Sequence, residues 1–279
     1  MGKTIAFWSP VKGQTGTTSN VLATSTLIGT EYISKKVLVT HTDEVNSSLE
    51  HGFFSKLNRS ENDFINFIDV GLDALTRFAN NRKLEPEMIR DYTHQIVNKL
   101  DLLYGSAKSK STSDSLVDAF QNIVDQCNQY YDFTLIDVQN YETKNKLSTD
   151  VLNKSDLVVV CLNQNTSLLD RYFVDNEWQH VIKDKPSIIL LGNYDKQSQY
   201  TVANISRKYK YKKAIYTIPS CTHYMDAYNM SAVAQFFMRN RNIDRRDGDY
   251  FFFEEVRRFA KGLISVLGLN AELSSERGA

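Results

Sequence analysis

The sequence predicts an α/β fold, a doubly wound and mostly parallel sheet of seven or eight strands flanked by helices. Short apolar runs alternate along the chain with longer segments of helical periodicity. Nearly continuous apolar runs of this length are typical of strands that are buried on both faces, as in parallel sheets. A loop with two glycines joins the first run to a helical segment, which fits the strand–helix alternation of this fold class.

The composition is that of an ordinary globular protein and argues against several other classes. Of the 279 residues, 42% are hydrophobic and 24% are charged, as in ordinary globular proteins. The 33 Lys and Arg residues balance the 33 Asp and Glu residues, so net charge gives no general attraction to nucleic acid or anionic membrane. Cys127, Cys161 and Cys221 show no CxxC spacing, which argues against a disulfide framework or a zinc ribbon. Without a membrane-spanning run or a signal-peptide pattern, we expect a cytoplasmic protein.

Seven apolar runs are the expected strands. Each run is only five or six residues long, which favours a strand over a helix. Helical patterns between them favour right-handed strand–helix–strand crossovers. The runs occupy residues 4–8, 36–40, 100–104, 133–137, 157–162, 187–191 and 214–218.

Three segments carry a clear helical pattern between the second and fifth runs. Apolar residues three and four positions apart predict helices over residues 64–78 and 116–131. A third pattern predicts a helix over residues 86–97, with Pro86 in its first turn, where proline is well tolerated.

The chain is expected to form a single domain. The segment between the second and fourth runs is longer than one crossover requires, so we interpret residues 53–99 as a helical elaboration of that domain. The domain then covers residues 1–268, and residues 269–279 are expected to form a flexible tail.

The loop after the first run has the features of a phosphate-binding loop. Gly13 and Gly16 would let the backbone approach a ligand closely. The hydroxyls of Thr17, Thr18 and Ser19 follow where a helix should begin, and the N–H groups of a helix N-terminus attract anions.

The loop departs from the standard pattern GxxxxGK[ST] at two positions. Gly16 and Thr18 occupy the last glycine and the Ser/Thr positions, whereas Val11 replaces the first glycine and Thr17 replaces the lysine. An alternative interpretation is a tight strand–helix turn whose hydroxyls only cap the helix. The loop sequence alone leaves both interpretations open.

Residues 12–18 (KGQTGTT) resemble the deviant Walker A motif, KGGxGK[ST], of the ParA/MinD-type ATPases. The resemblance implies that Lys12 is the signature lysine, which in that family reaches the phosphates bound by the partner subunit. It also implies that Thr18 binds Mg²⁺, while Thr17 replaces the lysine within the loop. The cofactor-binding residues that it implies in this loop are Lys12, Gly13, Gln14, Thr15, Gly16, Thr17, Thr18 and Ser19.

Two further segments resemble motifs that surround the γ-phosphate in the same family. Residues 36–43 end on Asp43, which falls on the carboxylate that orients the attacking water. His41 replaces the first acidic residue of that pair, and we expect it to occupy a polar pocket at the strand end. Residues 131–137 end on Asp137, at the position beside the Mg²⁺ shell.

Two more segments resemble the base-binding side of the family's site. Residues 187–193 resemble a strand that ends in an adenine-contacting asparagine, here Asn193, and residues 216–219 resemble the segment beside the base, which ends on Pro219. The segment around Asn193 is most similar to the TadZ/CpaE branch, localisation ATPases of pilus assembly. We expect no receiver-like domain of the kind that chains of this branch usually carry.

The resemblance implies a homodimeric switch that binds ATP and Mg²⁺, with Lys12 acting across the dimer and Asp43 as the second catalytic residue. A charge-assisted contact from a loop lysine contributes roughly 1.5–3 kcal/mol. Because Thr17 cannot supply such a contact, we hypothesise that ATP is hydrolysed slowly or not at all. The branch implies a role in positioning pilus or secretion components, at a cell pole.

Two other classes of function stay open. The chain could be a nucleotide-independent scaffold that keeps the fold and the dimer face, or a ParA-like DNA segregation ATPase. The basic segment 207–213 could contact nucleic-acid phosphates, although a solvated helix end is favoured. The amphipathic segment 250–267 could bind a membrane peripherally, although a helix packed on the sheet is favoured.

Overall fold

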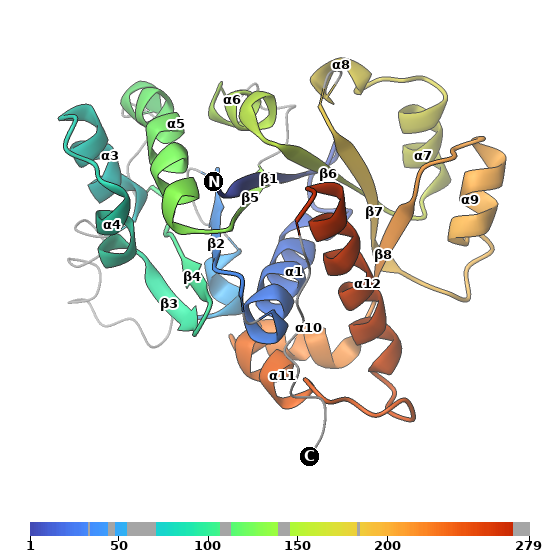
Figure 1. The fold of residues 1–279 in the computed structure, drawn as a ribbon. Helices are drawn as coiled ribbons and strands as arrows, with labels where there is room; N and C mark the ends of the chain where they lie inside the picture. The colour runs from blue at the N-terminus through green and yellow to red at the C-terminus, as the bar shows by residue number, and fades with distance from the viewer. Residues whose placement is uncertain are drawn as a thin grey trace.

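The computed structural model describes residues 1–32, 34–43, 48–54, 71–106, 113–138, 146–182 and 185–269. An eight-stranded sheet with helices on both faces forms its centre (Figure 1). The strand order is β3-β4-β2-β5-β1-β6-β7-β8, and every neighbouring pair is parallel except β3 and β4. This architecture confirms the predicted fold class. The strands are β1 (Lys3–Trp8), β2 (Val37–His41), β3 (His94–Val97), β4 (Leu100–Leu102), β5 (Phe133–Val138), β6 (Leu157–Leu162), β7 (Ser187–Tyr194) and β8 (Ile215–Pro219).

The central strands are apolar because both of their faces are covered. Every residue of β2, β5 and β6 is buried. Alternate residues of one strand therefore enter two separate cores, so that Phe7 packs on one side of the sheet and Trp8 on the other.

The helices divide between these two cores. One face of the sheet packs against α1 (Thr17–Glu31), the short 3₁₀ turn η1 (Glu50–Gly52), α10 (Thr222–Asn229), α11 (Val233–Arg239) and α12 (Tyr250–Val266). The opposite face packs against α3 (Leu72–Asn80), α4 (Pro86–Ile89), α5 (Ser113–Tyr130), α6 (Lys146–Lys154), α7 (Thr166–Phe173), α8 (Gln179–Ile182) and α9 (Val202–Lys208).

The predicted helix over residues 86–97 is wrong in its second half. The helix begins at Pro86 as expected, but it ends as α4 at Ile89 and continues only as a 3₁₀ turn, η3 (Arg90–Tyr92). The chain then forms β3, which pairs antiparallel with β4 at the edge of the sheet. Pairing with β4 overrides the local pattern, and a strand of four residues is too short to show the alternation that would reveal it.

The other expected helices are found where the structure describes them. The helix predicted over 116–131 is α5, and the described end of the one predicted over 64–78 is α3. Residues 55–70 and 270–279 lie outside the described part, so the first half of the expected elaboration and nearly all of the expected tail do as well. The strand β3 replaces the helical end of that elaboration.

The amphipathic segment near the C-terminus packs on the sheet. Its helix, α12, buries seven side chains against the core, among them Phe252, Phe259 and Leu263. The packed-helix interpretation is therefore confirmed, and the apolar face of α12 as far as Ile264 is covered by the protein itself. Across the described ranges, no helix combines the length and the hydrophobicity that crossing a bilayer requires.

Candidate functional site

A cleft of about 350 Å³ opens at the carboxyl ends of β1, β2 and β5, where the loop after β1 enters α1. Ligands of open α/β sheets bind at this edge, and the volume is within the range of small-molecule sites. The cleft brings together eight of the residues predicted from the sequence, namely Lys12, Gly13, Gly16, Thr17, Thr18, Ser19, Asp43 and Asp137.

The two loop glycines adopt a backbone conformation that other residues rarely adopt. Gly13 has a φ of 74° and Gly16 a φ of 65°, in the left-handed region that favours glycine. Gly16 is the N-cap of α1, and its carbonyl accepts the N–H of Asn20 at 2.8 Å. The loop thus directs the start of α1 toward the cleft, as anion binding at a helix N-terminus requires.

Side chains from α1 and from the end of β6, together with the backbone of β7, hold the loop from behind. Asn163 Nδ2 donates to the Gln14 carbonyl at 3.0 Å, and Asn20 Nδ2 donates to the Thr15 carbonyl at 3.2 Å. A Cβ on Gly192 would lie 2.1 Å from that same Thr15 oxygen, so only glycine lets β7 approach the loop. None of these three supports was predicted from the sequence. The roles of Asn163 and Gly192 depend on the order of strands in the sheet, whereas Asn20 acts within the first turn of α1.

The hydroxyl at the position of the loop lysine is engaged inside the loop. Thr17 Oγ1 lies 3.1 Å from Thr15 Oγ1, and it also contacts the thiol of Cys161 on β6. Among the described residues of the cleft lining, Lys12 is the one that carries a positive charge, and its side chain is exposed. In this part of the chain, positive charge at the cleft therefore comes from Lys12 and from backbone N–H groups.

Thr18 and Asp137 meet at the floor of the cleft. Thr18 Oγ1 donates to Asp137 Oδ2 at 2.6 Å. The pKa of Asp137 is raised from 3.8 to about 6, mainly because the carboxyl group is buried. The charge of Asp43 adds to this rise, while the Thr18 hydrogen bond and the charge of His41 oppose it. The pair offers one hydroxyl and one carboxylate oxygen on the side of the cleft, which are the ligand types that Mg²⁺ prefers.

Asp137→Asn is expected to stabilise the protein without ligand at neutral pH. The folded-state pKa of about 6 lies above the usual value of 3.8. Between pH 3.8 and pH 6 the folded protein therefore binds a proton on Asp137 that the unfolded chain has lost, so its stability falls as the pH rises through this range. The buried charge then costs about 3 kcal/mol above pH 6. We expect Asn to recover about 2 kcal/mol at pH 8 and almost nothing near pH 4, as measured by urea unfolding. The exposed Asp175→Asn variant should show no such pH-dependent gain, and a gain for Asp137→Asn that is equal at both pH values would contradict this account.

Four predicted nucleotide-contacting residues do not line the cleft. Gln14 and Thr15 lie in the loop, where their carbonyls accept the bonds from Asn163 and Asn20. The Asn193 side chain lies against the loop, since a Cβ on Gly16 would be 3.2 Å from its Nδ2.

Pro219 is the fourth of these residues, and it is also remote from the cleft lining. It is buried at the end of β8, where it pairs with Tyr194 of β7.

The cleft has a wall that the sequence did not indicate. Tyr228 of α10 lines it and donates its hydroxyl to the Ser48 carbonyl at 2.8 Å. The Tyr228 ring also meets the ring of His51 edge to face, with centroids 5.3 Å apart. These contacts tie α10 to η1 and close the side of the cleft near Asp43.

His41 occupies the polar pocket expected for it. The residue is buried, and its Nε2 lies 3.4 Å from Glu50 Oε1, which also accepts the N–H of Gly105 at 3.3 Å. His41 pairs with Asp137 in the register of β2 and β5, which explains its influence on that carboxylate. This arrangement confirms the polar-pocket interpretation.

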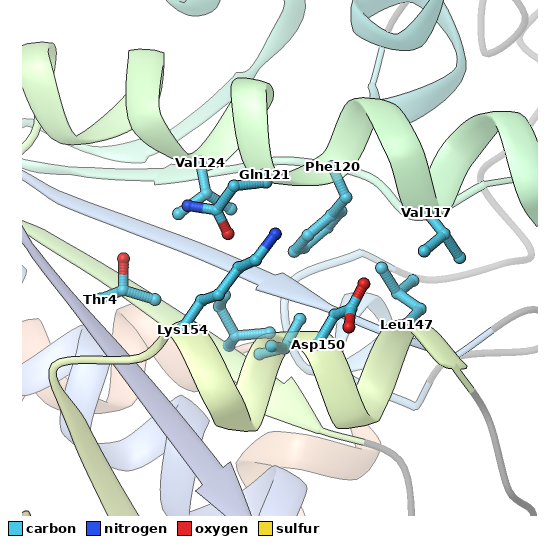
Figure 2. A pocket seen from close by; sticks show the side chains of 10 residues that line it. Thr4, Val117, Phe120, Gln121, Val124, Leu147, Asp150 and Lys154 are labelled. Atoms are coloured by element: carbon cyan, nitrogen blue, oxygen red, sulfur yellow. The ribbon is translucent and has the colours of Figure 1, made fainter. Parts of the chain in front are cut away.

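A second hollow, between α5 and α6, is too small for a ligand. Figure 2 shows the apolar side chains of Val117, Phe120 and Leu147 facing one another, with Asp150 and Lys154 beside them. Its volume is about 10 Å³, about that of one water molecule. It is a packing defect between two helices.

No family model matches the chain, and no curated protein sequence matches it. Its fold is nevertheless shared by solved structures of ParA and MinD proteins. A ParA family ATPase from Chlorobium tepidum TLS has a TM-score of 0.68 at 13% identity, covering 94% of this chain and 99% of that one. The septum site-determining protein MinD from Pyrococcus horikoshii, complexed with Mg-ADP, has a TM-score of 0.63 at 14% identity, covering 96% and 98%. A Borrelia burgdorferi protein assigned to plasmid partition, bound to AMPPNP, has a TM-score of 0.61 at 16% identity, covering 96% and 98%.

Proposed function

We propose that the protein is an ATP-binding switch of the ParA/MinD type that forms a homodimer across the nucleotide and hydrolyses ATP slowly or not at all. One observation carries the proposal: the Thr18–Asp137 contact lies beside the two left-handed loop glycines in a single cleft at the carboxyl edge of the sheet. Two proteins of the same fold were solved with Mg-ADP and with AMPPNP, which supports the choice of ligand.

The residues of the cleft fit a magnesium nucleotide. Thr18 donates its proton to Asp137, so its oxygen lone pairs are left for a cation. In the described residues, no group of three His, Cys, Asp or Glu side chains could hold a metal. Mg²⁺ would therefore depend on phosphate oxygens for most of its ligands, as it commonly does in nucleotide sites. The bound ion would neutralise phosphate charge, and Asp43 would orient the attacking water.

The loop supplies less positive charge than a standard phosphate loop, which has a lysine at the position of Thr17. The Thr17 hydroxyl contacts Thr15 and Cys161, and it carries no charge that could meet the γ-phosphate. The Lys12 side chain is exposed at the cleft, which supports a contact with a second subunit. We infer that dimerisation brings the partner's cation to each nucleotide, which makes nucleotide binding and dimerisation mutually dependent.

The cellular role that we propose is spatial positioning, in the manner of the TadZ/CpaE branch, of pilus or secretion components at a cell pole. It rests on the resemblance of the segment around Asn193. The DNA segregation alternative has less support, because the basic segment contains the exposed end of α9, where Lys208 Nζ contacts Asp170 at 3.1 Å. The scaffold alternative is favoured by one observation, the inward-facing hydroxyl of Thr17.

Thr17→Lys is expected to tighten the binding of Mg-ATP by roughly tenfold to a hundredfold, because it restores one charge-assisted contact to phosphate. Hydrolysis should also become faster, since the restored cation meets charge that develops on the transferred group. Isothermal titration calorimetry and phosphate release measure the two effects.

The control for Thr17→Lys adds one lysine at an exposed position of α12. Ser265→Lys lies on the exposed side of α12 and should leave both measurements unchanged. If the natural protein fails to bind Mg-ATP and Thr17→Lys brings no binding, the nucleotide proposal is wrong and the scaffold alternative stands.

A further inference from the structure

Another hollow, with a volume of about 200 Å³, lies near the amino ends of β2, β4 and β5, whereas the cleft lies at the carboxyl ends of the strands. Part of its lining comes from residues just before β2, β4 and β5, whereas Asp43 of the cleft follows β2. Lys36 and Lys99 directly precede β2 and β4, and the Val37 N–H donates to the Lys99 carbonyl at 2.8 Å. The length of the five-residue strand β2, about 16 Å, separates this hollow from the cleft. Its lining is Lys36, Arg90, Gln95, Asn98, Lys99, Asp101, Tyr130 and Tyr131.

The lining carries three positive charges and one negative charge. Lys36, Lys99 and Arg90 belong to three different segments, and no carboxylate of the described residues forms an ion pair with any of them. The fold thus brings together three cations that, among the residues described, have no carboxylate within ion-pair distance. Like charges held in one concave site repel one another, and a bound anion relieves that repulsion.

The one carboxylate of the hollow is occupied by a tyrosine. Asp101 Oδ2 accepts the hydroxyl of Tyr131 at 2.6 Å, and Tyr131 is also 3.3 Å from the hydroxyl of Thr93. Burial raises the pKa of Asp101, while the Tyr131 hydrogen bond and the charges of Arg90, His94 and Lys36 lower it. Asp101 therefore offsets one of the three positive charges and leaves the lining with a net charge of two positive.

We propose that this hollow is a second ligand site, one that binds the dianionic phosphate group of a small phosphate monoester. A monoester carries a charge of about −1.5 to −2 at neutral pH, which matches the net charge of two positive in the lining. Arg90 can present its planar fork to two phosphate oxygens, and Lys36 and Lys99 act as point charges.

The remaining lining fits the organic part of such a ligand. The Tyr130 and Tyr131 rings meet edge to face, with centroids 4.9 Å apart, and Lys36 Nζ lies 4.2 Å from the Tyr130 ring. The side-chain amides of Gln95 and Asn98, both exposed, can donate to ligand oxygens. An aromatic wall next to a cationic wall favours a phosphate attached to a ring or another flat group.

The test measures phenyl phosphate binding to the full chain by isothermal titration calorimetry, with Mg-ADP in excess to occupy the phosphate loop. We expect the Arg90→Ala/Lys99→Ala double variant to weaken binding by about a hundredfold or more, because each cation contributes a charge-assisted contact worth about tenfold. Lys35→Ala is the matched control. It removes a neighbouring lysine that lies 3.9 Å from Asp132 outside the hollow, so binding should not change.

Asp101→Asn is expected to change the affinity for phenyl phosphate in the opposite direction from the double variant. Asparagine keeps an acceptor for Tyr131 and removes the negative charge, so phenyl phosphate should bind several-fold more tightly. Benzenesulfonate, which has the same ring and one charge, should bind the natural protein more weakly than phenyl phosphate does. Weaker binding by Asp101→Asn, or benzenesulfonate binding as tight as that of phenyl phosphate, would contradict the charge argument.

A spectroscopic measurement locates the ligand if the double variant fails to fold. In the natural protein, phenyl phosphate should shift the NMR signals of the Gln95 and Asn98 side-chain amides. The proposal is overturned if millimolar phenyl phosphate gives no binding, if the double variant binds as the natural protein does, or if those amide signals do not move. The binding of Mg-ADP should be equal in all these variants, so the failure of this proposal and that of the nucleotide proposal can be told apart.

Discussion

Gly192→Ala is expected to weaken the binding of Mg-ATP by at least about a hundredfold. The added Cβ would lie 2.1 Å from the Thr15 carbonyl oxygen and 2.7 Å from Asn20 Nδ2, distances that no real methyl group tolerates. The Thr15–Asn20 hydrogen bond must break, and the loop must move away from β7. The loop N–H groups then lose their alignment toward the phosphates, and overpacking of this kind also costs about 1–3 kcal/mol of stability. Calorimetry with Mg-ATP measures the loss of binding.

Gly248→Ala is the matched control for this substitution. A Cβ on Gly248 would meet nothing within 4 Å, so binding and stability should both stay at the natural level. Gly192→Ala protein that is folded by circular dichroism and binds Mg-ATP as tightly as the Gly248→Ala protein would show that β7 does not fix the loop.

Arg257→Ala is expected to lower the free energy of unfolding by about 3–5 kcal/mol, the usual cost of removing one partner of a buried ion pair. Arg257 Nη2 lies 2.7 Å from Glu31 Oε1, and the two side chains are only 13% and 7% exposed. The same guanidinium nitrogen donates to the Arg241 carbonyl at 2.7 Å. One side chain thus joins α12, the end of α1 and the connector before α12, and its loss leaves the Glu31 charge buried without this partner.

The neighbouring arginine provides the comparison. Arg258 is 48% exposed and pairs with Glu255 one turn earlier, so its removal should cost less than about 1 kcal/mol. Urea unfolding at pH 7 measures both variants. Equal losses for Arg257→Ala and Arg258→Ala would mean that burial of the first pair has no energetic consequence.

Most of the fold could be predicted, because buried parallel strands reveal themselves as short apolar runs. All seven expected runs contain strands of the sheet. The strand β3 escaped prediction, since its side chains are exposed or half-buried and it depends on pairing with β4. The strand β8 at the other edge is mostly buried and shows an apolar run, whereas β3 has no buried residue that would identify it.

The cleft residues that could be predicted are those that short sequence patterns identify. Thr18 and Gly16 lie within one loop, and Asp137 ends a buried strand, so their residue types and positions were informative. The residues that hold the loop in place could not be predicted from such patterns. Asn163 and Gly192 reach the loop only because β6 and β7 follow β1 in the sheet order, and Tyr228 reaches the cleft from α10 on the other side of α1. Predicting these contacts requires the strand order, which no local pattern contains.

The central claim is that ATP controls dimerisation through Lys12, and the mass of the protein in solution tests it most directly. Multi-angle light scattering would be recorded with and without Mg-ATP on the natural protein, on Lys12→Ala and on Lys210→Ala, an exposed lysine in the connector between α9 and β8. We predict that Mg-ATP doubles the mass from 32.0 kDa for the natural protein and for Lys210→Ala, and that Lys12→Ala stays monomeric. A mass that is indifferent to Mg-ATP, or a Lys12→Ala protein that dimerises as the natural protein does, would contradict the account.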